Sequence, residues 1–127
     1  MIEAPTEQIT VATLDDIAFD AHGLIAAVVQ DVAAGEVRMV GYMNREALAR
    51  TIDTGQVWFW SRSRGAYWRK GETSGNTLAM VEVLVDCDGD ALLIRVHPTG
   101  PTCHTGARTC FFRRLAGPDG AQPGEGE

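Results

Sequence analysis

Short apolar runs bounded by turn residues make up the first part of the chain. Residues 24–31 and 37–43 are two such runs, and the residues between them, Ala33-Ala34-Gly35-Glu36, are typical of a turn. Two apolar runs around a glycine-bearing turn predict a β-hairpin.

The segment that follows carries the signals of a helix. Asn44 is a good N-cap residue, and Gly55 stands where a left-handed residue commonly ends a helix. Between them Ala47, Leu48 and Ile52 recur at helical spacing, so we predict a helix over residues 45–54.

The rest of the chain is predicted to consist mainly of strands. Asp88-Gly89 is a dipeptide favoured in type I′ hairpin turns. A polar loop is expected at 70–76, and a second loop at 98–109, which holds two prolines and two glycines. The expected strands are 57–61, 66–69, 77–87, 90–97 and 110–115. About seven strands and one clear helix predict an α+β, β-rich small domain of mostly antiparallel strands.

The length of 127 residues fits one domain, expected over residues 1–115 with 1–10 loose. Residues 116–127 are rich in glycine, proline and acid, and we expect a disordered tail. No apolar stretch approaches the roughly 20 residues of a membrane helix. The N-terminus has no basic region followed by an apolar run, so we expect a cytoplasmic protein with no membrane partner.

The net charge of −6 is unevenly distributed. Residues 57–114 contain eight Lys/Arg and five Asp/Glu, whereas the remainder contains three and twelve. An acidic protein with a basic island suits a small anionic ligand better than nucleic acid. Charge alone fits a purely solvated distribution equally well.

Three cysteines, Cys87, Cys103 and Cys110, are the first candidates for chemistry. An odd number of cysteines in a cytosolic chain argues against disulfides. Thiolates are good zinc ligands, and three protein ligands with one open position is the catalytic zinc arrangement. The spacings match no common zinc finger, so three unrelated thiols are the alternative. His104 follows Cys103 directly and is a candidate zinc ligand or general acid/base.

Two further groups of residues are candidates for binding. Asp86, Asp88 and Asp90 form an oxygen-rich cluster that favours Mg²⁺ or Ca²⁺, although an exposed acidic hairpin tip has the same composition. The segment 58–75 mixes aromatic residues, hydroxyls and cations, which bind bases and phosphate. A packed sheet with a basic edge is the alternative there. The candidate substrate-binding residues are Arg62, Arg64, Trp68, Lys70, Thr73 and Ser74.

Several longer segments resemble the phosphoribosyl-AMP cyclohydrolase family of histidine biosynthesis. They are GLIAAVVQD (23–31), YMNREAL (42–48), FWSRSRG (59–65), WRKGETSGN (68–76), DCDGDALL (86–93) and GPTCHTGARTCF (100–111). The resemblance covers about residues 23–114. Ala26 and His22 depart from residues common in the family, but neither lies in a metal motif.

The resemblance implies a zinc-dependent hydrolase that opens the N1–C6 bond of the adenine ring of 1-(5-phosphoribosyl)-AMP. It implies a homodimer with one zinc per subunit, held at the interface by Cys103 and Cys110 and by Cys87 of the other subunit. The resemblance makes Asp86, Asp88 and Asp90 the Mg²⁺ ligands and gives His104 a catalytic role. Some members carry a fused second enzyme domain, and the short tail predicts the monofunctional form.

Two other functions are weighed against the cyclohydrolase. A module with structural zinc would bind nucleic acid through the Trp/Arg segment, although the acidic total opposes this. A redox sensor would use Cys103 and Cys110 as its reactive pair.

Overall fold

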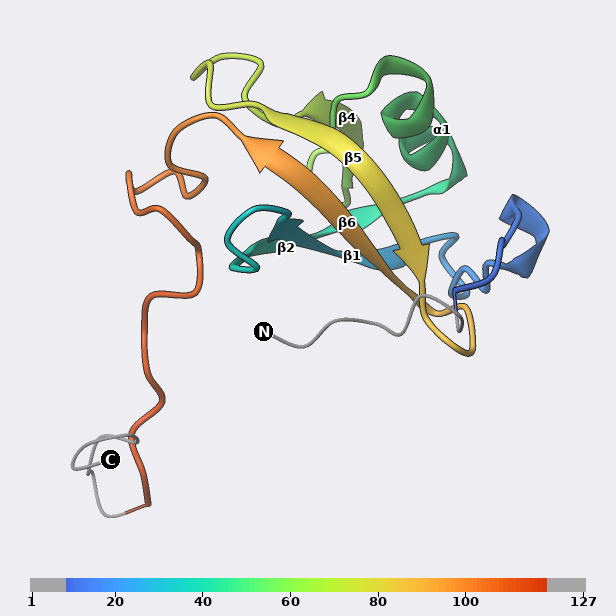
Figure 1. The fold of residues 1–127 in the computed structure, drawn as a ribbon. Coiled ribbons are helices and arrows are strands. Elements are labelled where there is room, and N and C mark those ends of the chain that lie inside the picture. Colours follow the sequence, from blue (N-terminus) through green and yellow to red (C-terminus); the bar gives the residue numbers. More distant parts are fainter. Residues whose placement is uncertain (1–8, 119–127) are drawn as a thin grey trace.

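The protein's structure, a computed structural model, describes residues 9–118 and confirms a strand-rich α+β fold (Figure 1). Residues 1–8 of the predicted loose segment and 119–127 of the predicted tail lie outside the described residues. The elements are the 3-10 helix η2 (Leu14–Asp16), β1 (Ile25–Asp31), β2 (Val37–Met43), α1 (Arg45–Thr54), β3 (Trp58–Ser61), β4 (Ala66–Arg69), β5 (Leu78–Val85) and β6 (Ala91–Pro98).

The strands form two sheets. One has four strands in the order β2-β1-β6-β5, and β3 pairs with β4 in a separate hairpin. All pairs are antiparallel except the central one, where β1 and β6 run parallel with Asp31 opposite Val96. The β1–β2 turn and the segment after β6 therefore leave the sheet at the same end, and the β5–β6 turn lies at the other end.

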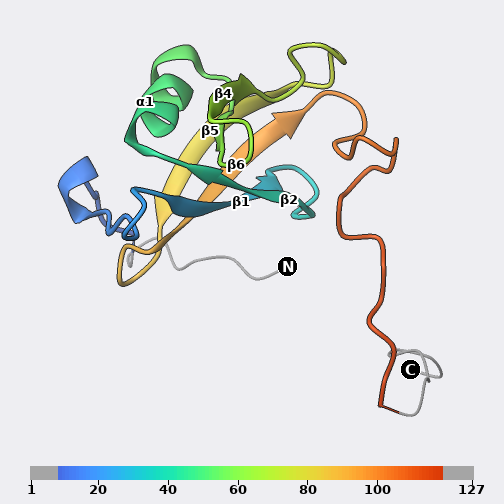
Figure 2. The same cartoon turned by 180° about the vertical axis from the view of Figure 1, so that it is seen from behind.

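The core fixes the β3–β4 hairpin against the sheet. Every second residue of β1 and β6 is buried, and Leu48 of α1 and Phe59 of β3 join this core. The ring of Phe59 lies 4.8 Å from that of Trp68 across the hairpin. Figure 2, the view from behind, shows α1 and β4 on the same side of the molecule. Trp68 is thus held by core packing rather than by a loop.

Helix α1 begins and ends as predicted. The Asn44 side chain accepts a hydrogen bond from the Ala47 amide at 2.9 Å, and Gly55 adopts φ +71° at the C-terminus. The Asn44 amide group also donates to the Tyr67 hydroxyl at 3.0 Å, which ties the helix start to β4.

Replacing Asn44 with alanine should lower the free energy of unfolding by about 1 kcal/mol, and by up to about 2, because the helix loses its cap. Urea unfolding followed by circular dichroism measures the change. Asn44→Asp keeps a capping oxygen and should retain most of the stability. Equal midpoints for Asn44→Ala and the wild type would contradict this role.

The predicted strand over residues 110–115 does not form, so the described residues contain six strands rather than about seven. The Cys110 amide donates to the Arg38 carbonyl of β2 at 2.8 Å, but the chain then leaves the sheet (Figures 1 and 2). Phe111, Phe112 and Leu115 are exposed as a result. An apolar run becomes a strand only where its backbone groups find a neighbouring strand.

The β5–β6 turn also differs from the predicted type I′ geometry. That turn needs positive φ at both central residues, but among the described residues only glycines have positive φ. Gly89, with φ +77°, donates its amide to the Asp86 carbonyl at 3.1 Å. The Asp86 carboxylate accepts from the amides of Asp90 and Ala91, and these bonds stabilise a longer turn.

Within residues 9–118, every helix is too short or too polar to cross a membrane.

Candidate active site

The segment after β6, residues 99–110, folds back on itself and carries two of the predicted zinc ligands. The Cys103 amide donates to the Ala107 carbonyl at 3.1 Å, and the Cys110 amide reaches the Arg38 carbonyl on β2. The thiols of Cys103 and Cys110 lie close enough that each one affects the acidity of the other. We call this segment the cysteine loop.

The cysteine loop is held on the sheet by Arg38, which is buried in β2. Its guanidinium donates to the Arg108 carbonyl at 2.9 Å and to the Thr102 hydroxyl at 3.2 Å. The carboxylates of Asp31 and Glu36 lie 3.3 Å and 3.1 Å from the guanidinium and balance its charge. No pattern in the sequence indicated this network, because Thr102 and Arg108 lie 64 and 70 positions from Arg38 in the chain.

The two neighbouring thiols differ in acidity. A hydrogen bond from the Thr105 hydroxyl, 3.1 Å from the Cys103 sulfur, holds the pKa of Cys103 below its usual range. Partial desolvation, and then the interaction with the neighbouring Cys103 thiol, raises the pKa of Cys110. Because zinc binds the thiolate, the pair offers an acidic ligand at Cys103 with a second thiol beside it. This donor set fits a soft metal ion.

A hollow of about 460 Å³ joins the cysteine loop to β4 and to the loop 70–76, and we call it the cysteine hollow. It brings together most of the site residues that the sequence predicted. These are Arg64, Trp68, Lys70, Thr73, Ser74, Cys103 and His104. Asn76, Thr102 and Gly106 also line it and were not predicted, although they lie within the same motif segments.

The charges around the cysteine hollow favour an anion. Arg64, Arg69 and Lys70 line it, and in residues 9–118 none of them forms an ion pair. Glu72 is the single described acid in the lining. Unpaired cations beside the hydroxyls of Thr73 and Ser74 suit a phosphate group.

Arg62, also predicted as a substrate-binding residue, does not line the cysteine hollow. Its guanidinium lies over the Tyr42 ring, 4.5 Å from the ring centre, in a second hollow between β2 and β3. Trp68 lines both hollows.

The predicted magnesium ligands lie together in the β5–β6 turn. Oxygens of Asp86, Asp88 and Asp90 all lie within 4.8 Å of one another, and the three residues are exposed. Hydrogen bonding with Asp88 and Asp86, together with their negative charges, raises the pKa of Asp90 to about 6. A bound cation would relieve the part of this shift that comes from the neighbouring negative charges.

This pKa shift gives a stability prediction for the metal-free protein. The folded-state pKa of Asp90 exceeds its ordinary value of 3.8, so its stabilising contribution is present below that value and is lost as the pH rises through about 6. Asp90→Asn should therefore raise the melting temperature above that of the wild type at neutral pH, and the difference should vanish near pH 4. Thermal unfolding in a chelating buffer measures this.

Asp15→Asn, an exposed aspartate outside the turn, should leave the melting temperature nearly unchanged at both pH values. A stabilisation by Asp90→Asn that persists undiminished at acid pH would contradict the assigned repulsion.

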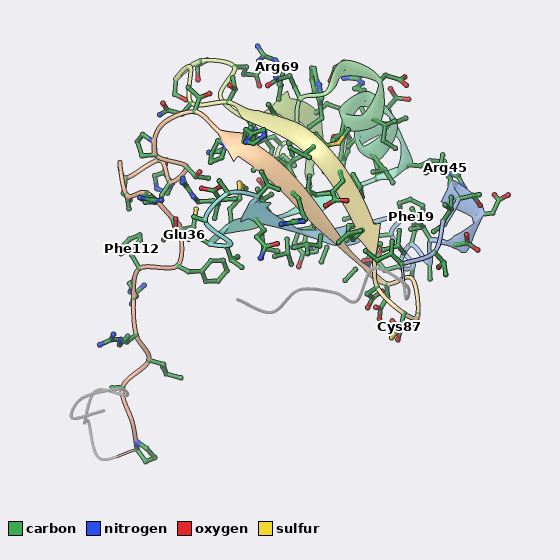
Figure 3. All side chains as sticks on the ribbon, in the orientation of Figure 1. Phe19, Glu36, Arg45, Arg69, Cys87 and Phe112 are labelled. Carbon is green, nitrogen blue, oxygen red and sulfur yellow. The ribbon has the colours of Figure 1, made fainter. Side chains whose placement is uncertain are left out.

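Cys87 lies at the opposite end of the sheet from the other cysteines. It is exposed in the β5–β6 turn, and the whole length of β6 separates it from the cysteine loop. Figure 3 shows Cys87 at the hairpin tip, far from Glu36, whose carboxylate pairs with Arg108 of the cysteine loop. A single chain therefore does not bring the three cysteines together. The acidic cluster is the only group of three or more potential metal ligands found in the described part of the chain.

Comparison with known proteins identifies the family of this chain. A sequence model described as phosphoribosyl-AMP cyclohydrolase matches residues 39–112, which include every predicted site residue. The phosphoribosyl-AMP cyclohydrolase of Sphingopyxis alaskensis is 60% identical over 97 residues, covering 76% of this chain and 77% of that protein. The enzyme of the same name from Bordetella petrii is 53% identical over 111 residues, covering 87% of this chain and 83% of that protein.

A relative with a second name matches over a smaller share of its own length. The histidine biosynthesis bifunctional protein HisIE of Thermus thermophilus is 59% identical over 102 residues, which are 80% of this chain but 48% of that protein. The family match spans more than half of the chain, and the resemblance inferred from the motifs is confirmed. The chain belongs to the phosphoribosyl-AMP cyclohydrolase family, the hydrolases of that name in histidine biosynthesis.

Proposed function

We propose that this chain hydrolyses the N1–C6 bond of the adenine ring of 1-(5-phosphoribosyl)-AMP, the third step of histidine biosynthesis. The product is the formimino-imidazole carboxamide ribonucleotide. The observation that carries the proposal is the cysteine hollow, where Cys103 and His104 share one cavity with unpaired cations and hydroxyls. A metal-binding thiol and a proton-transfer group beside phosphate-binding groups suit hydrolysis of a phosphorylated nucleotide.

The thiols of Cys103 and Cys110 are proposed to hold zinc. They are neighbours, and the lowered pKa of Cys103 favours the thiolate that zinc binds. With Cys87 of a second copy as third ligand, one position stays open, as in catalytic zinc sites. Bound there, zinc supplies Lewis-acid chemistry that lowers the pKa of a water molecule to about 7.

The proposed third ligand requires a homodimer. Cys87 and the cysteine loop lie at opposite ends of one sheet, so a two-fold arrangement can place each tip against the other copy's loop. One zinc per subunit then results. Cys87→Ser and Cys103→Ser enzymes should each be inactive.

Mixing these two variants provides a test of the shared site. A mixed dimer has one intact site and one site that carries both substitutions. Random exchange of subunits should therefore restore about a quarter of the wild-type activity. Failure to recover activity, with subunit exchange shown by mass spectrometry, would contradict a site shared between copies.

The acidic turn is proposed to bind Mg²⁺. Asp86, Asp88 and Asp90 present clustered oxygens, the ligands this ion prefers. A bound cation would also offset the negative charges of Asp86 and Asp88, which, after their hydrogen bonds, raise the pKa of Asp90.

His104 is proposed as the proton-transfer residue. C6 of an N1-substituted adenine is electrophilic, because the substituted ring carries positive charge or is readily protonated. His104 takes a proton from the attacking water and later delivers it to N1 as the N1–C6 bond breaks. The exocyclic nitrogen stays on the carbon and becomes the carboxamide nitrogen. Trp68 provides a stacking surface, and Arg64, Lys70, Thr73 and Ser74 hold phosphate.

Incubation with 1-(5-phosphoribosyl)-AMP tests the reaction. Ring opening followed by ultraviolet absorbance, without release of ammonia, is the expected result. Ammonia release in step with turnover would instead show deamination, which shares attack at C6 but expels the exocyclic amine.

One observation also favours a redox function. The neighbouring thiols of Cys103 and Cys110 are what a reactive pair requires. Thiol titration of the purified protein separates the two functions. Zinc ligation should protect both thiols until a chelator is added, whereas a redox pair should react equally with and without the chelator.

A further inference from the structure

The second hollow, which we call the arginine hollow, adjoins the cysteine hollow because Trp68 lines both. It has a volume of about 620 Å³ and lies between β2 and the β3–β4 hairpin. Besides Trp68, its large side chains are Tyr42, Trp60 and Arg62, with the hydroxyls of Ser61 and Ser63 beside them. Apart from Trp68, the mechanism proposed above uses none of the residues that line this hollow.

Arg62 is the one cation in the described lining of the arginine hollow, and no described acid lines it. Arg62 forms no ion pair in residues 9–118. Asp20 is close enough to respond to its charge, but the Asp20 carboxylate already accepts the amides of His22 and Leu24. The Ser61 and Ser63 hydroxyl oxygens lie 3.3 Å apart. An unpaired guanidinium beside two hydroxyls suits a phosphate group.

The two hollows match the shape of the proposed substrate, so this step rests on the proposed function. Its purine carries one phosphoribosyl arm on N1 and another on N9, on opposite sides of the ring. The reacting carbon C6 is bonded to N1, so C6 and the N1 arm belong with Cys103 and His104 in the cysteine hollow. The N9 arm then points away from the reacting bond.

We infer that the arginine hollow is the subsite for the N9 arm, the half of the substrate that corresponds to 5′-AMP. Arg62 holds its 5′-phosphate, with Ser61 and Ser63 as hydroxyl donors. The purine stacks on Trp68 where the two hollows meet, and Lys70 with the 70–76 loop holds the phosphate of the N1 arm. Both hollows contain cations and share the Trp68 ring, so together they select a nucleotide with two phosphates.

Binding of 5′-AMP and of ribose 5-phosphate to the zinc-loaded dimer tests the inference, because each probe carries one of the two arms. Arg62→Met should weaken 5′-AMP binding by about 10- to 100-fold, as expected for a lost charged hydrogen bond. It should leave the affinity for ribose 5-phosphate unchanged. Lys70→Met should weaken the binding of ribose 5-phosphate and leave the affinity for 5′-AMP unchanged. Isothermal titration calorimetry measures both affinities.

Arg45→Met is the matched control, since Arg45 also lies over an aromatic ring, 5.9 Å from the centre of Phe19, but lines neither hollow. It should bind both probes like the wild type. Arg62 is exposed, so its replacement should not affect folding, and a melting curve checks this.

Measurements of turnover distinguish a failure of this inference from a failure of the proposed function. Arg62→Met should raise KM for 1-(5-phosphoribosyl)-AMP with little change in kcat, as loss of uniform binding does. An Arg62→Met enzyme that turns over the substrate at the wild-type rate, with unchanged KM and unchanged 5′-AMP affinity, would overturn the subsite alone. Absence of turnover by the wild type would overturn the proposed function, while the calorimetry would still decide whether the arginine hollow binds the nucleotide arm.

Discussion

Replacing Cys103 with serine should release the zinc and reduce turnover to the background of the uncatalysed reaction. Cys103 supplies the more acidic thiol of the pair, and serine oxygen is a poor substitute for a zinc-binding thiolate. Loss of a residue that hydrogen-bonds to a metal ligand typically lowers metal affinity by about 10- to 100-fold. Loss of the ligand itself should lower the affinity further. Zinc content by atomic absorption, with steady-state rates, measures the effect.

The fold should survive this substitution, which gives the experiment its control. Serine has nearly the shape of cysteine, so the metal-free variant and the metal-free wild type should melt at similar temperatures. Thr105→Val removes the hydrogen bond to the Cys103 sulfur, and with it the bond that the Thr105 oxygen accepts from the Ala107 amide, but it keeps the ligand itself and should weaken zinc binding to a smaller degree. A Cys103→Ser enzyme that keeps its zinc and its rate would remove this cysteine from the metal site.

Replacing His104 with alanine should lower kcat by about 10²- to 10⁴-fold, the usual contribution of general acid/base catalysis. Zinc content should remain intact, because the proposed ligands are all thiolates. Rates and zinc content measured on the same preparation give both results.

His22→Ala is the control for removing a histidine, because His22 is exposed and lines neither the cysteine hollow nor the arginine hollow. Its rate should match that of the wild type. Loss of zinc from His104→Ala would make His104 a ligand instead of a proton-transfer residue.

Local patterns predicted the local structure well. The helix over 45–54 was bounded correctly because Asn44 and Gly55 carry the signals that begin and end a helix. The strand over 66–69 was also confirmed, and the bounds of the other five observed strands differ from prediction by at most two residues. Each of these features depends on residues that are close together in the chain, so a single sequence is enough to predict it.

Features that depend on distant partners were not predictable in this way. The parallel pairing of β1 with β6 joins segments about 65 positions apart, and no local pattern encodes it. The run 110–115 has the composition of a strand, but only Cys110 finds a backbone partner on β2. Arg38 was not singled out, although its buried guanidinium holds the cysteine loop.

The candidate site also combines features that the sequence predicted with features that only the structure shows. The motifs placed Cys103, His104, Lys70 and Trp68 on the list of site residues, and the structure brings all four to one hollow. Sequence reasoning alone did not separate Arg62 from Arg64, two residues away, although they line different hollows. Both arginines lie in the turn between β3 and β4, and only the structure shows which hollow each one lines.

The most direct test of the central claim is turnover of 1-(5-phosphoribosyl)-AMP by the purified protein before and after removal of zinc. We predict ring opening that a chelator abolishes and that added zinc restores, at about one zinc per subunit. A folded, zinc-loaded protein that leaves this substrate unchanged, or one that turns it over at full rate without metal, would contradict the account.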